Sequence, residues 1–455
     1  MAEFKKINIR FALGGMGQNL IYALVGGGFL FYYTEAAGFS AATIGTLLLV
    51  VRIYGLVVDP FIAIIIEKTH TQWGKYKPYI TFMPPIISLL FVALFYQPNL
   101  SQDSYLIYVY IITLLFWTAY AFFDISLWAM VPSITKEENK RMKLLTTSKM
   151  AILFAAFCLG IVQMPLIKWL GQNDYSVGFL LLSIILAITF TICGLLLSNS
   201  MGSINKTDND GERREKVERK ISLGDMVKAL IANKPLIIII LAKVLIYIPV
   251  SIKTSLAIYF YKYNLGNDTL TSVSSLISLP VTLILVALIP KLIKKYSDKV
   301  IMLFILIVHG VISLIYIVNT DISMVYLIID GVSTAALGVY SLIITNTVAS
   351  AVEYGEWKTN LRLESLIFST NTISSKFASG ISGAMAGWIL TGIGYVPGTT
   401  QSAGTLSALH QVMVWIPVVG ITLGAIIMTR YKLTSKMYKE IVKELELRKQ
   451  ECTDQ

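Results

Sequence analysis

The run SVGFLLLSIILAITFTICGLLL, residues 176–197, contains no charged side chain and is long enough to cross a bilayer as one helix. A hydrocarbon core about 30 Å thick requires about 20 apolar residues, because a helix rises about 1.5 Å per residue. Runs of this kind recur along the whole chain of 455 residues. They predict a protein that folds in the lipid bilayer.

The predicted spans number twelve, and six lie on each side of the one long polar stretch, Ser198–Ser222. A six-plus-six arrangement is typical of carriers built from two parallel repeats, whose site lies between the halves near the midplane. The predicted spans lie near 11–33, 41–66, 79–96, 105–131, 147–170, 176–197, 235–261, 269–290, 300–319, 323–350, 365–392 and 411–430.

The predicted fold is therefore an all-α membrane protein, with twelve transmembrane helices in two pseudo-symmetric six-helix bundles. The N-terminal bundle covers residues 1–197 and the C-terminal bundle covers residues 235–430. A cytoplasmic linker between the halves occupies residues 198–234, and a cytoplasmic tail occupies residues 431–455.

Charge and composition exclude several classes of protein. Hydrophobic residues make up 55% of the chain and charged residues only 14%, whereas soluble proteins carry roughly 25% charged residues. The net charge of +11 comes from Lys and Arg grouped in alternate short connections, which indicates membrane orientation rather than nucleic-acid binding. This pattern places both termini in the cytoplasm, with the protein in the cell (inner) membrane.

No motif for enzymatic chemistry is present in the sequence. The three cysteines, Cys158, Cys193 and Cys452, have neither disulfide nor metal-ligand spacing. A phosphate-binding loop of Walker type and a His-Glu-x-x-His motif are also absent. We therefore expect no catalytic residues, metal or cofactor, and we disfavour an ATP-driven pump or a membrane enzyme.

Charged residues inside the predicted spans are the strongest functional signal. Each costs about 2.5–3.5 kcal/mol at the centre of a span, so each is expected to face the protein interior and to have a partner or a role. These residues are Arg52, Asp59, Asp124 and Lys149 in the first half and Lys243, Lys253, Asp330 and Lys376 in the second.

Arg52 and Asp59 are seven residues apart on the second span and share one helix face. A buried Asp can bind a cation or carry a proton, and this predicts a coupling role. The alternative is that both residues pair with neighbouring helices and only hold the bundle together.

Two pairs of residues have the i, i+4 spacing that places side chains on one helix face. Asp124 and Trp128 combine a hydrogen-bond acceptor with an aromatic ring, which suits a sugar; alternatively, they are an interface anchor and a charge partner for Lys149. Thr372 and Lys376 repeat the spacing on the eleventh span, where the alternative role is a structural ion pair.

The remaining buried polar residues give weaker signals. Lys243 and Lys253 are ten residues apart on the seventh span, and either could snorkel toward the membrane surface. We interpret Asp330 as a residue near a helix end and His309 as a packing residue.

Five segments resemble the glycoside-pentoside-hexuronide:cation symporters of the major facilitator superfamily, and among these most closely the melibiose permease. Their order along the chain and their span, from the second predicted helix to beyond the eleventh, make a chance likeness improbable. The segments are RIYGLVVDP (52–60), THTQWGKYKP (69–78), DISLWAMVPSIT (124–135), EYGEWKTNLRLES (353–365) and GIGYVPGTTQS (392–402).

The resemblance implies a sugar site between the halves and a cation site near the second and fourth spans. It assigns to cytoplasmic gating loops the residues Lys75, Lys77, Glu353, Glu356, Arg362 and Glu364, and it leaves Arg52 and Lys253 as possible charge partners. The positions that match the family's sugar site are Gln18, Asn19, Asp124, Trp128, Lys149, Thr372 and Lys376.

The cation site departs from the family pattern. Asp59 matches one of two cation-site carboxylates, but Gly55 stands at the place of the other. Val58 and Ala121 also replace residues that offer side-chain oxygens in the melibiose permease. Because sodium needs several oxygen ligands and a proton needs one titratable group, we expect coupling to protons rather than sodium.

The sugar site departs from the family pattern as well. Gln18 and Asn19 replace a Lys and Asp pair, so one carboxylate is lost while Lys149 and Lys376 remain. A glucuronide or another hexuronide is therefore a candidate substrate beside neutral glycosides. The expected function is import of a sugar by a monomeric symporter through alternating access; a sodium-coupled symporter and a lipid or amphiphile carrier are the alternatives.

Overall fold

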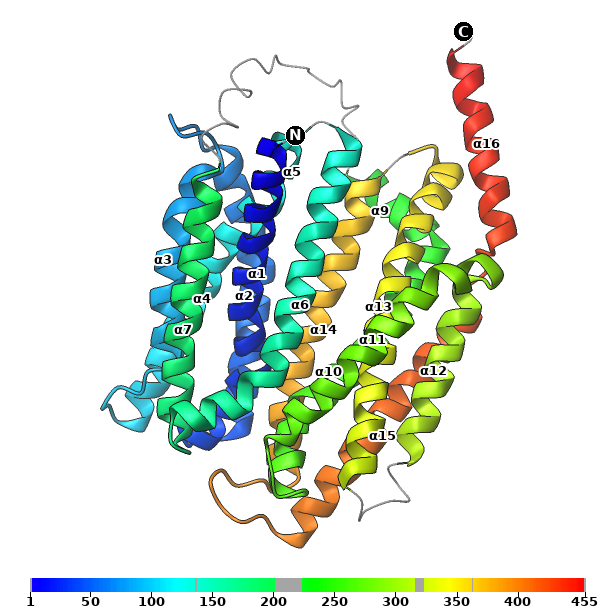
Figure 1. Ribbon diagram of the computed structural model, residues 1–455. Coiled ribbons are helices and arrows are strands. Elements are labelled where there is room, and N and C mark those ends of the chain that lie inside the picture. Colours follow the sequence, from blue (N-terminus) through cyan, green and yellow to red (C-terminus); the bar gives the residue numbers. More distant parts are fainter. Residues whose placement is uncertain (1, 136, 201–222, 316–322, 362, 454–455) are drawn as a thin grey trace. The chain divides into compact units, whose positions relative to one another are not determined.

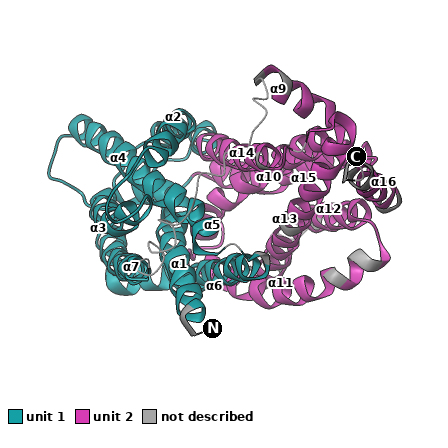
Figure 2. Cartoon of the chain, turned by 90° about the horizontal axis from the view of Figure 1, so that it is seen from above, with its two compact units in different colours: residues 1–214, 387–401 teal, residues 215–386, 402–455 magenta. Residues whose placement is uncertain are grey.

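The computed structural model describes residues 2–135, 137–200, 223–315, 323–361 and 363–453. Every regular element in these residues is a helix (Figure 1). The chain divides into two compact units (Figure 2), which are described separately. Unit 1 comprises residues 1–214 and 387–401, and unit 2 comprises residues 215–386 and 402–455.

The helices of the first half of the chain belong to unit 1. A one-turn π-helix, η1 (Tyr32–Ala36), continues the first helix. The other elements are α1 (Ala2–Phe31), α2 (Ala41–Glu67), α3 (Lys77–Leu94), α4 (Gln102–Ala129), α5 (Val131–Ile134), α6 (Glu138–Leu170) and α7 (Tyr175–Ser198).

The helices of the second half build unit 2, except that the last residues of α14 cluster with unit 1. These elements are α9 (Leu223–Ala232), α10 (Lys234–Tyr263), α11 (Leu270–Lys295), α12 (Asp298–Ile315), α13 (Ser323–Thr359), α14 (Glu364–Gly392), α15 (Ala403–Thr429) and α16 (Ser435–Thr453).

Each of the twelve predicted spans coincides with a helix, which confirms the prediction of an all-α fold. The first span covers α1 and the start of η1, and residues 316–319 of the ninth lie outside the described residues. Nine helices in the described part of the chain are long and apolar enough to cross a membrane.

Several helices extend beyond the apolar run that predicted them. The structure corrects the predicted loop at Glu353, because α13 continues as a helix to Thr359. Likewise α15 begins at Ala403, where the Ser402 side chain accepts a hydrogen bond of 3.1 Å from the Thr405 backbone N–H. Hydropathy marks the part of a helix that lies in lipid, whereas caps and helix propensity set where the helix ends.

The predicted linker and tail contain short helices of their own. Residues 201–222 of the linker lie outside the described residues, and α9 occupies Leu223–Ala232. Helix α16 occupies most of the tail. The predicted domain boundaries themselves stay predictions.

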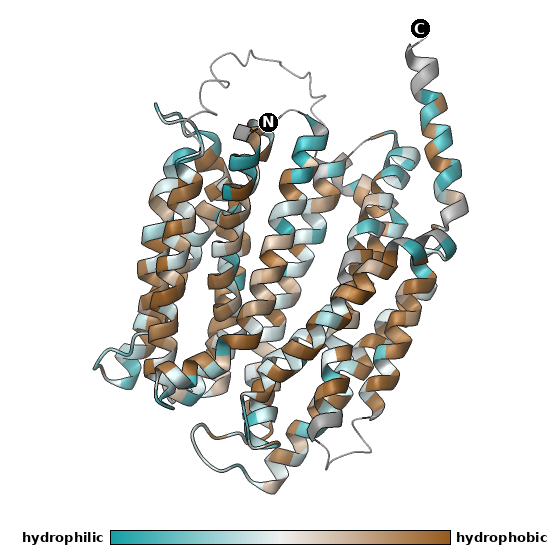
Figure 3. Cartoon of the chain, viewed as in Figure 1, coloured by the Kyte–Doolittle hydropathy of each residue, from teal (hydrophilic) through white to brown (hydrophobic). Residues whose placement is uncertain are grey.

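The surface is apolar along the helices, as a bilayer requires. Leu89 is 74% exposed and Trp169 is 75% exposed. Figure 3 shows hydrophobic residues along the helices of both units, with hydrophilic residues at many helix ends and along α16. Extensive exposed apolar surface of this kind marks contact with a membrane rather than with water.

Candidate functional site

The carboxylate of Asp124 on α4 is the centre of a polar cluster inside unit 1. Its Oδ1 accepts a hydrogen bond of 2.6 Å from Gln18 Nε2 on α1 and one of 3.0 Å from Trp128 Nε1. Gln18 is buried, while Asp124 and Trp128 are half-buried. The structure thus brings together three of the predicted sugar-site residues, which we call the Asp124 cluster.

Packing around the Asp124 cluster orients its aromatic ring. The Trp128 ring meets the buried ring of Phe11 edge to face, with 6.0 Å between ring centroids. Because this contact and the hydrogen bond to Asp124 hold the indole at two points, the ring is a preorganised surface. A ring beside a carboxylate suits a ligand that has both C–H faces and hydroxyl groups.

Arg52 on α2, predicted as a possible charge partner, contacts an aromatic ring of α4. Its guanidinium lies over the Trp117 ring of α4, 4.6 Å from the ring centroid. No ion pair of Arg52 occurs among the described residues. A cation–π contact of this kind holds α2 against α4 and keeps the charge close to the interior of unit 1.

Asp59, the predicted coupling residue, is half-buried on α2. Ile62 and Ile66 of α2 form a small buried apolar cluster with Ala121 of α4, and Val58, the residue before Asp59, packs against this cluster. At Gly55 an added Cβ would have no other atom within 4 Å. Neither Val58 nor Gly55 therefore offers a side-chain oxygen near Asp59 on α2.

Asn19 and Lys149, two further predicted sugar-site residues of unit 1, are more exposed than Gln18. Asn19 is half-buried beside Gln18 on α1. Lys149 is exposed on α6, in the segment where Asn8 of α1 donates a hydrogen bond of 3.1 Å to Thr147.

Unit 2 contains a buried ion pair that corrects the interpretation of Asp330. Lys253 Nζ on α10 lies 2.7 Å from Asp330 Oδ1, which is buried well inside α13. The other oxygen, Oδ2, accepts hydrogen bonds of 2.7 Å from Tyr261 and 2.6 Å from Ser274. Asp330 is therefore a component of the core of unit 2, not a residue at a helix end.

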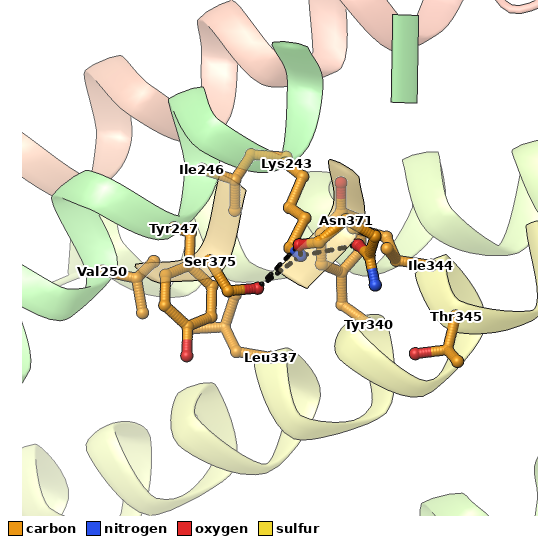
Figure 4. Close-up of a pocket in the computed structure, with 10 residues that line it drawn as sticks. All are labelled: Lys243, Ile246, Tyr247, Val250, Leu337, Tyr340, Ile344, Thr345, Asn371 and Ser375. Atoms are coloured by element: carbon orange, nitrogen blue, oxygen red, sulfur yellow. Dashed lines mark hydrogen bonds between the residues drawn. The ribbon is translucent and has the colours of Figure 1, made fainter. Parts of the chain in front are cut away.

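Lys243 on α10 borders a cavity of ≈ 190 Å³ that lies wholly within unit 2 (Figure 4). Its ammonium group donates to Asn371 Oδ1 at 2.7 Å, to the Asn371 carbonyl at 2.9 Å and to Ser375 Oγ at 2.6 Å. A weaker contact of 3.4 Å reaches Ser374. Lys243 does not snorkel, since it is only 8% exposed. We call this site the Lys243 pocket.

The predicted pair Thr372 and Lys376 follows Asn371 on α14. Lys376 is half-buried, whereas Thr372 is exposed and donates a hydrogen bond of 3.1 Å to the Phe368 carbonyl. His309, predicted to serve packing, is fully buried on α12, with its Nδ1 2.5 Å from Ser333 Oγ.

The predicted gating residues lie on helix ends and one loop. Lys75 Nζ lies 2.6 Å from Glu67 at the end of α2. Partial burial opposes the charge of Lys75, but its hydrogen bond to Glu67 and the further interactions with Tyr76 and Glu67 together raise the pKa of Lys75. Lys77 begins α3, Glu353 and Glu356 lie within α13, Glu364 begins α14, and Arg362 lies outside the described residues.

Sequence reasoning missed the Lys243 pocket and the Asp330 network because both depend on contacts between helices. The one available signal was the presence of two lysines in a single apolar span. It could not tell which lysine meets a carboxylate and which meets neutral oxygens.

Comparisons with known proteins agree over nearly the whole chain. A family model described as MFS/sugar transport protein matches residues 10–435. The isoprimeverose transporter of Lactiplantibacillus pentosus is 30% identical over 441 residues, which cover 96% of this chain and 90% of the relative. The glucuronide carrier protein homolog of Escherichia coli (strain K12) is 25% identical over 447 residues, which cover 97% of this chain and 95% of the relative.

A solved structure supports the same architecture. The crystal structure of the nucleoside transporter NupG matches with a TM-score of 0.65, covering 94% of this chain and 100% of that chain. The sequence identity is 14%, so this likeness concerns the fold alone.

Proposed function

The chain belongs to the MFS/sugar transport protein family, and from this premise we propose that it imports a sugar or glycoside together with protons. It is a multi-pass membrane transporter with the all-helical fold of the major facilitator superfamily, not an enzyme. The proposed mechanism is alternating access. Loaded and empty carriers change state and half-loaded carriers do not, which couples the two fluxes.

The observation that carries the proposal is the Asp124 cluster. A carboxylate fixed by Gln18 and Trp128 offers an acceptor for sugar hydroxyls beside an aromatic plate for a C–H face. The site is already rigid before a ligand arrives, which lowers the entropy cost of binding. We infer that Asn19, Lys149, Thr372 and Lys376 complete the sugar site, as the family resemblance implies.

For the coupling ion, we propose protonation of Asp59. One titratable carboxylate is sufficient for a proton, whereas a sodium ion requires several oxygens. Val58 packs against an apolar cluster and Gly55 has no side chain, so neither position supplies an oxygen ligand for sodium. In this proposal, protonation removes a charge from the interior and favours the change of state of the loaded carrier.

Uptake into proteoliposomes tests the proposal. We expect accumulation driven by an inward proton gradient, collapse of accumulation with a protonophore, and no dependence on sodium. Asp59→Asn should abolish uphill accumulation but preserve sugar exchange. Strong stimulation by sodium, or accumulation that survives Asp59→Asn, contradicts proton coupling through Asp59.

The substrate class, orientation and gates are also part of the proposal. The substrate is a glycoside, and hexuronides are candidates because the site positions hold more lysines than carboxylates. Both termini face the cytoplasm, and the charges from Lys75 to Lys77 and from Glu353 to Glu364 act as cytoplasmic gates in a monomer. Protease accessibility of the tail in sealed inside-out and right-side-out vesicles tests the orientation.

A further inference from the structure

Lys243 is a buried positive charge held only by neutral groups. The groups that contact its ammonium are a backbone carbonyl, an amide oxygen and two hydroxyls. Among the described residues, no acidic side chain contacts it. These neutral oxygens hold the ammonium in place, but they do not cancel its charge. A full positive charge in a membrane protein interior is costly, and it persists where it faces a counter-charge or serves a ligand.

Lys253, ten residues later on the same helix, provides an internal comparison. Its charge is neutralised by Asp330 at 2.7 Å, and that carboxylate receives two further hydrogen bonds. The Lys253 pair thus has the fully satisfied arrangement of a structural ion pair. Lys243 has the opposite arrangement, since it borders an open cavity and meets only neutral groups.

We propose that Lys243 forms a subsite for the carboxylate of an acidic sugar. The inference rests on the proposed function and specifies its substrate class. A carboxylate accepts several hydrogen bonds and carries the counter-charge that the Lys243 pocket lacks. The cavity of ≈ 190 Å³ exceeds the volume of about 30 Å³ that one water molecule takes in the liquid, so it can admit such a group.

Matched pairs of sugars test the subsite directly. The probes are methyl glucuronide with methyl glucoside and methyl galacturonide with methyl galactoside, because each pair differs only in its carboxylate. Binding is measured by calorimetry in nanodiscs of zwitterionic lipid, which excludes anionic headgroups as the occupant. We expect Lys243→Gln to weaken uronide binding at least about tenfold and to change neutral-sugar binding by less than about twofold.

Two more variants separate charge recognition from structure. Lys243→Arg keeps the charge and should retain most uronide affinity. Lys262→Gln removes a positive charge from the last turn of the same helix and should leave both affinities unchanged. Thermal unfolding of each variant verifies that it is folded.

The possible results distinguish failure of the subsite from failure of the proposed function. Equal losses for uronide and neutral sugar in Lys243→Gln overturn the subsite and assign Lys243 to shaping the site or neutralising a carboxylate of the chain. No loss for either sugar also overturns it. A wild-type protein that binds glycosides but no uronide overturns the subsite and leaves the proposed function standing. Failure of the wild type to take up any neutral or acidic sugar counts against the proposed function itself.

Discussion

At the scale of single residues, a substitution of Asp124 gives the most direct test of the proposed sugar site in unit 1. Asp124→Asn removes the charge that Gln18 and Trp128 approach at 2.6 Å and 3.0 Å. Hydrogen bonds to a charged group contribute about 1.5–3 kcal/mol, so we expect sugar affinity to fall by about 10- to 100-fold.

The matched control is Asp103→Asn, which makes the same change in the exposed first turn of the same helix. Calorimetry or substrate-protected thermal shift measures both variants. Unchanged affinity in Asp124→Asn would exclude the cluster from the sugar site.

A substitution at Gly55 tests whether the coupling ion is a proton or a sodium ion. Because nothing lies within 4 Å of a Cβ at this position, Gly55→Asp can place a second carboxylate one helix turn from Asp59 without a clash. Two carboxylates can ligate sodium, so we expect sodium-stimulated uptake that the wild type lacks. Gly55→Asn has the same size without the charge and should remain independent of sodium, and a sodium-indifferent Gly55→Asp contradicts the interpretation.

At the scale of elements, the Lys253–Asp330 pair joins α10 to α13. Lys253→Met leaves Asp330 buried without its counter-ion, and breaking a buried pair in this way costs about 3–5 kcal/mol. We expect a clear drop in the thermal unfolding midpoint. The double variant Lys253→Met with Asp330→Leu should recover most of the loss; equal stability of the wild type and the single variant would show that the pair does not stabilise unit 2.

Helix α16 docks on the end of α13 through Glu444. Trp357 Nε1 donates a hydrogen bond of 2.8 Å to Glu444, and Arg448 forms an ion pair of 2.6 Å with it. The hydrogen bond from Trp357, followed by that from Arg448, lowers the pKa of Glu444 below its ordinary value of 4.5. A lowered carboxyl pKa means that docking is complete above pH 4.5 and is lost as the pH falls through the lowered pKa.

Hydrogen exchange of Ser435–Thr453 measures this docking. We expect slow exchange at pH 7 and faster exchange, corrected for the intrinsic rate, at a pH below the lowered pKa of Glu444. Glu444→Gln should exchange faster at both values, whereas Glu446→Gln on the same helix should behave as the wild type. Exchange rates that do not respond to Glu444→Gln would show that this contact does not hold α16.

At the scale of the whole molecule, the end of the eleventh span and the loop after it, residues 387–401, cluster with unit 1, whereas the rest of α14 belongs to unit 2. Thr391 Oγ1 accepts a hydrogen bond of 2.9 Å from the Ala42 backbone N–H, and Trp388 donates to Thr46 at 3.2 Å. A Cβ at Gly387 would lie 2.2 Å from the Ala41 carbonyl oxygen, so only glycine permits this approach. If the halves rock during transport, these contacts have to separate.

A disulfide between Ala42→Cys and Thr391→Cys tests that separation in a background without the native cysteines. We expect oxidation to stop uptake and a reducing agent to restore it, while each single variant stays active. Full uptake by the cross-linked protein would show that this contact persists through the transport cycle.

Hydropathy predicted the helices but not the roles of their charges. A span is recognisable because lipid demands a continuous apolar surface, so all twelve predicted spans fall on helices. Helix ends were less predictable, as α13 shows, because a helix continues into water wherever its caps and propensities allow. The i, i+4 spacing of Asp124 and Trp128 predicted their contact, whereas no local pattern could add Gln18 from α1.

Membrane location, an all-helical fold and the resemblance to sugar symporters could all be predicted from the sequence, because these properties depend on local composition and on motifs. The neutralisation of Lys253 by Asp330, and the neutral oxygens that hold Lys243 beside a cavity, are visible only in the folded protein. The two lysines occupy the same apolar helix, and the sequence of that helix does not distinguish them. The two lysines differ in the residues of other helices that contact them. Electrostatic contacts act over a few ångströms, so they depend on how the helices pack and not on the order of residues along the chain.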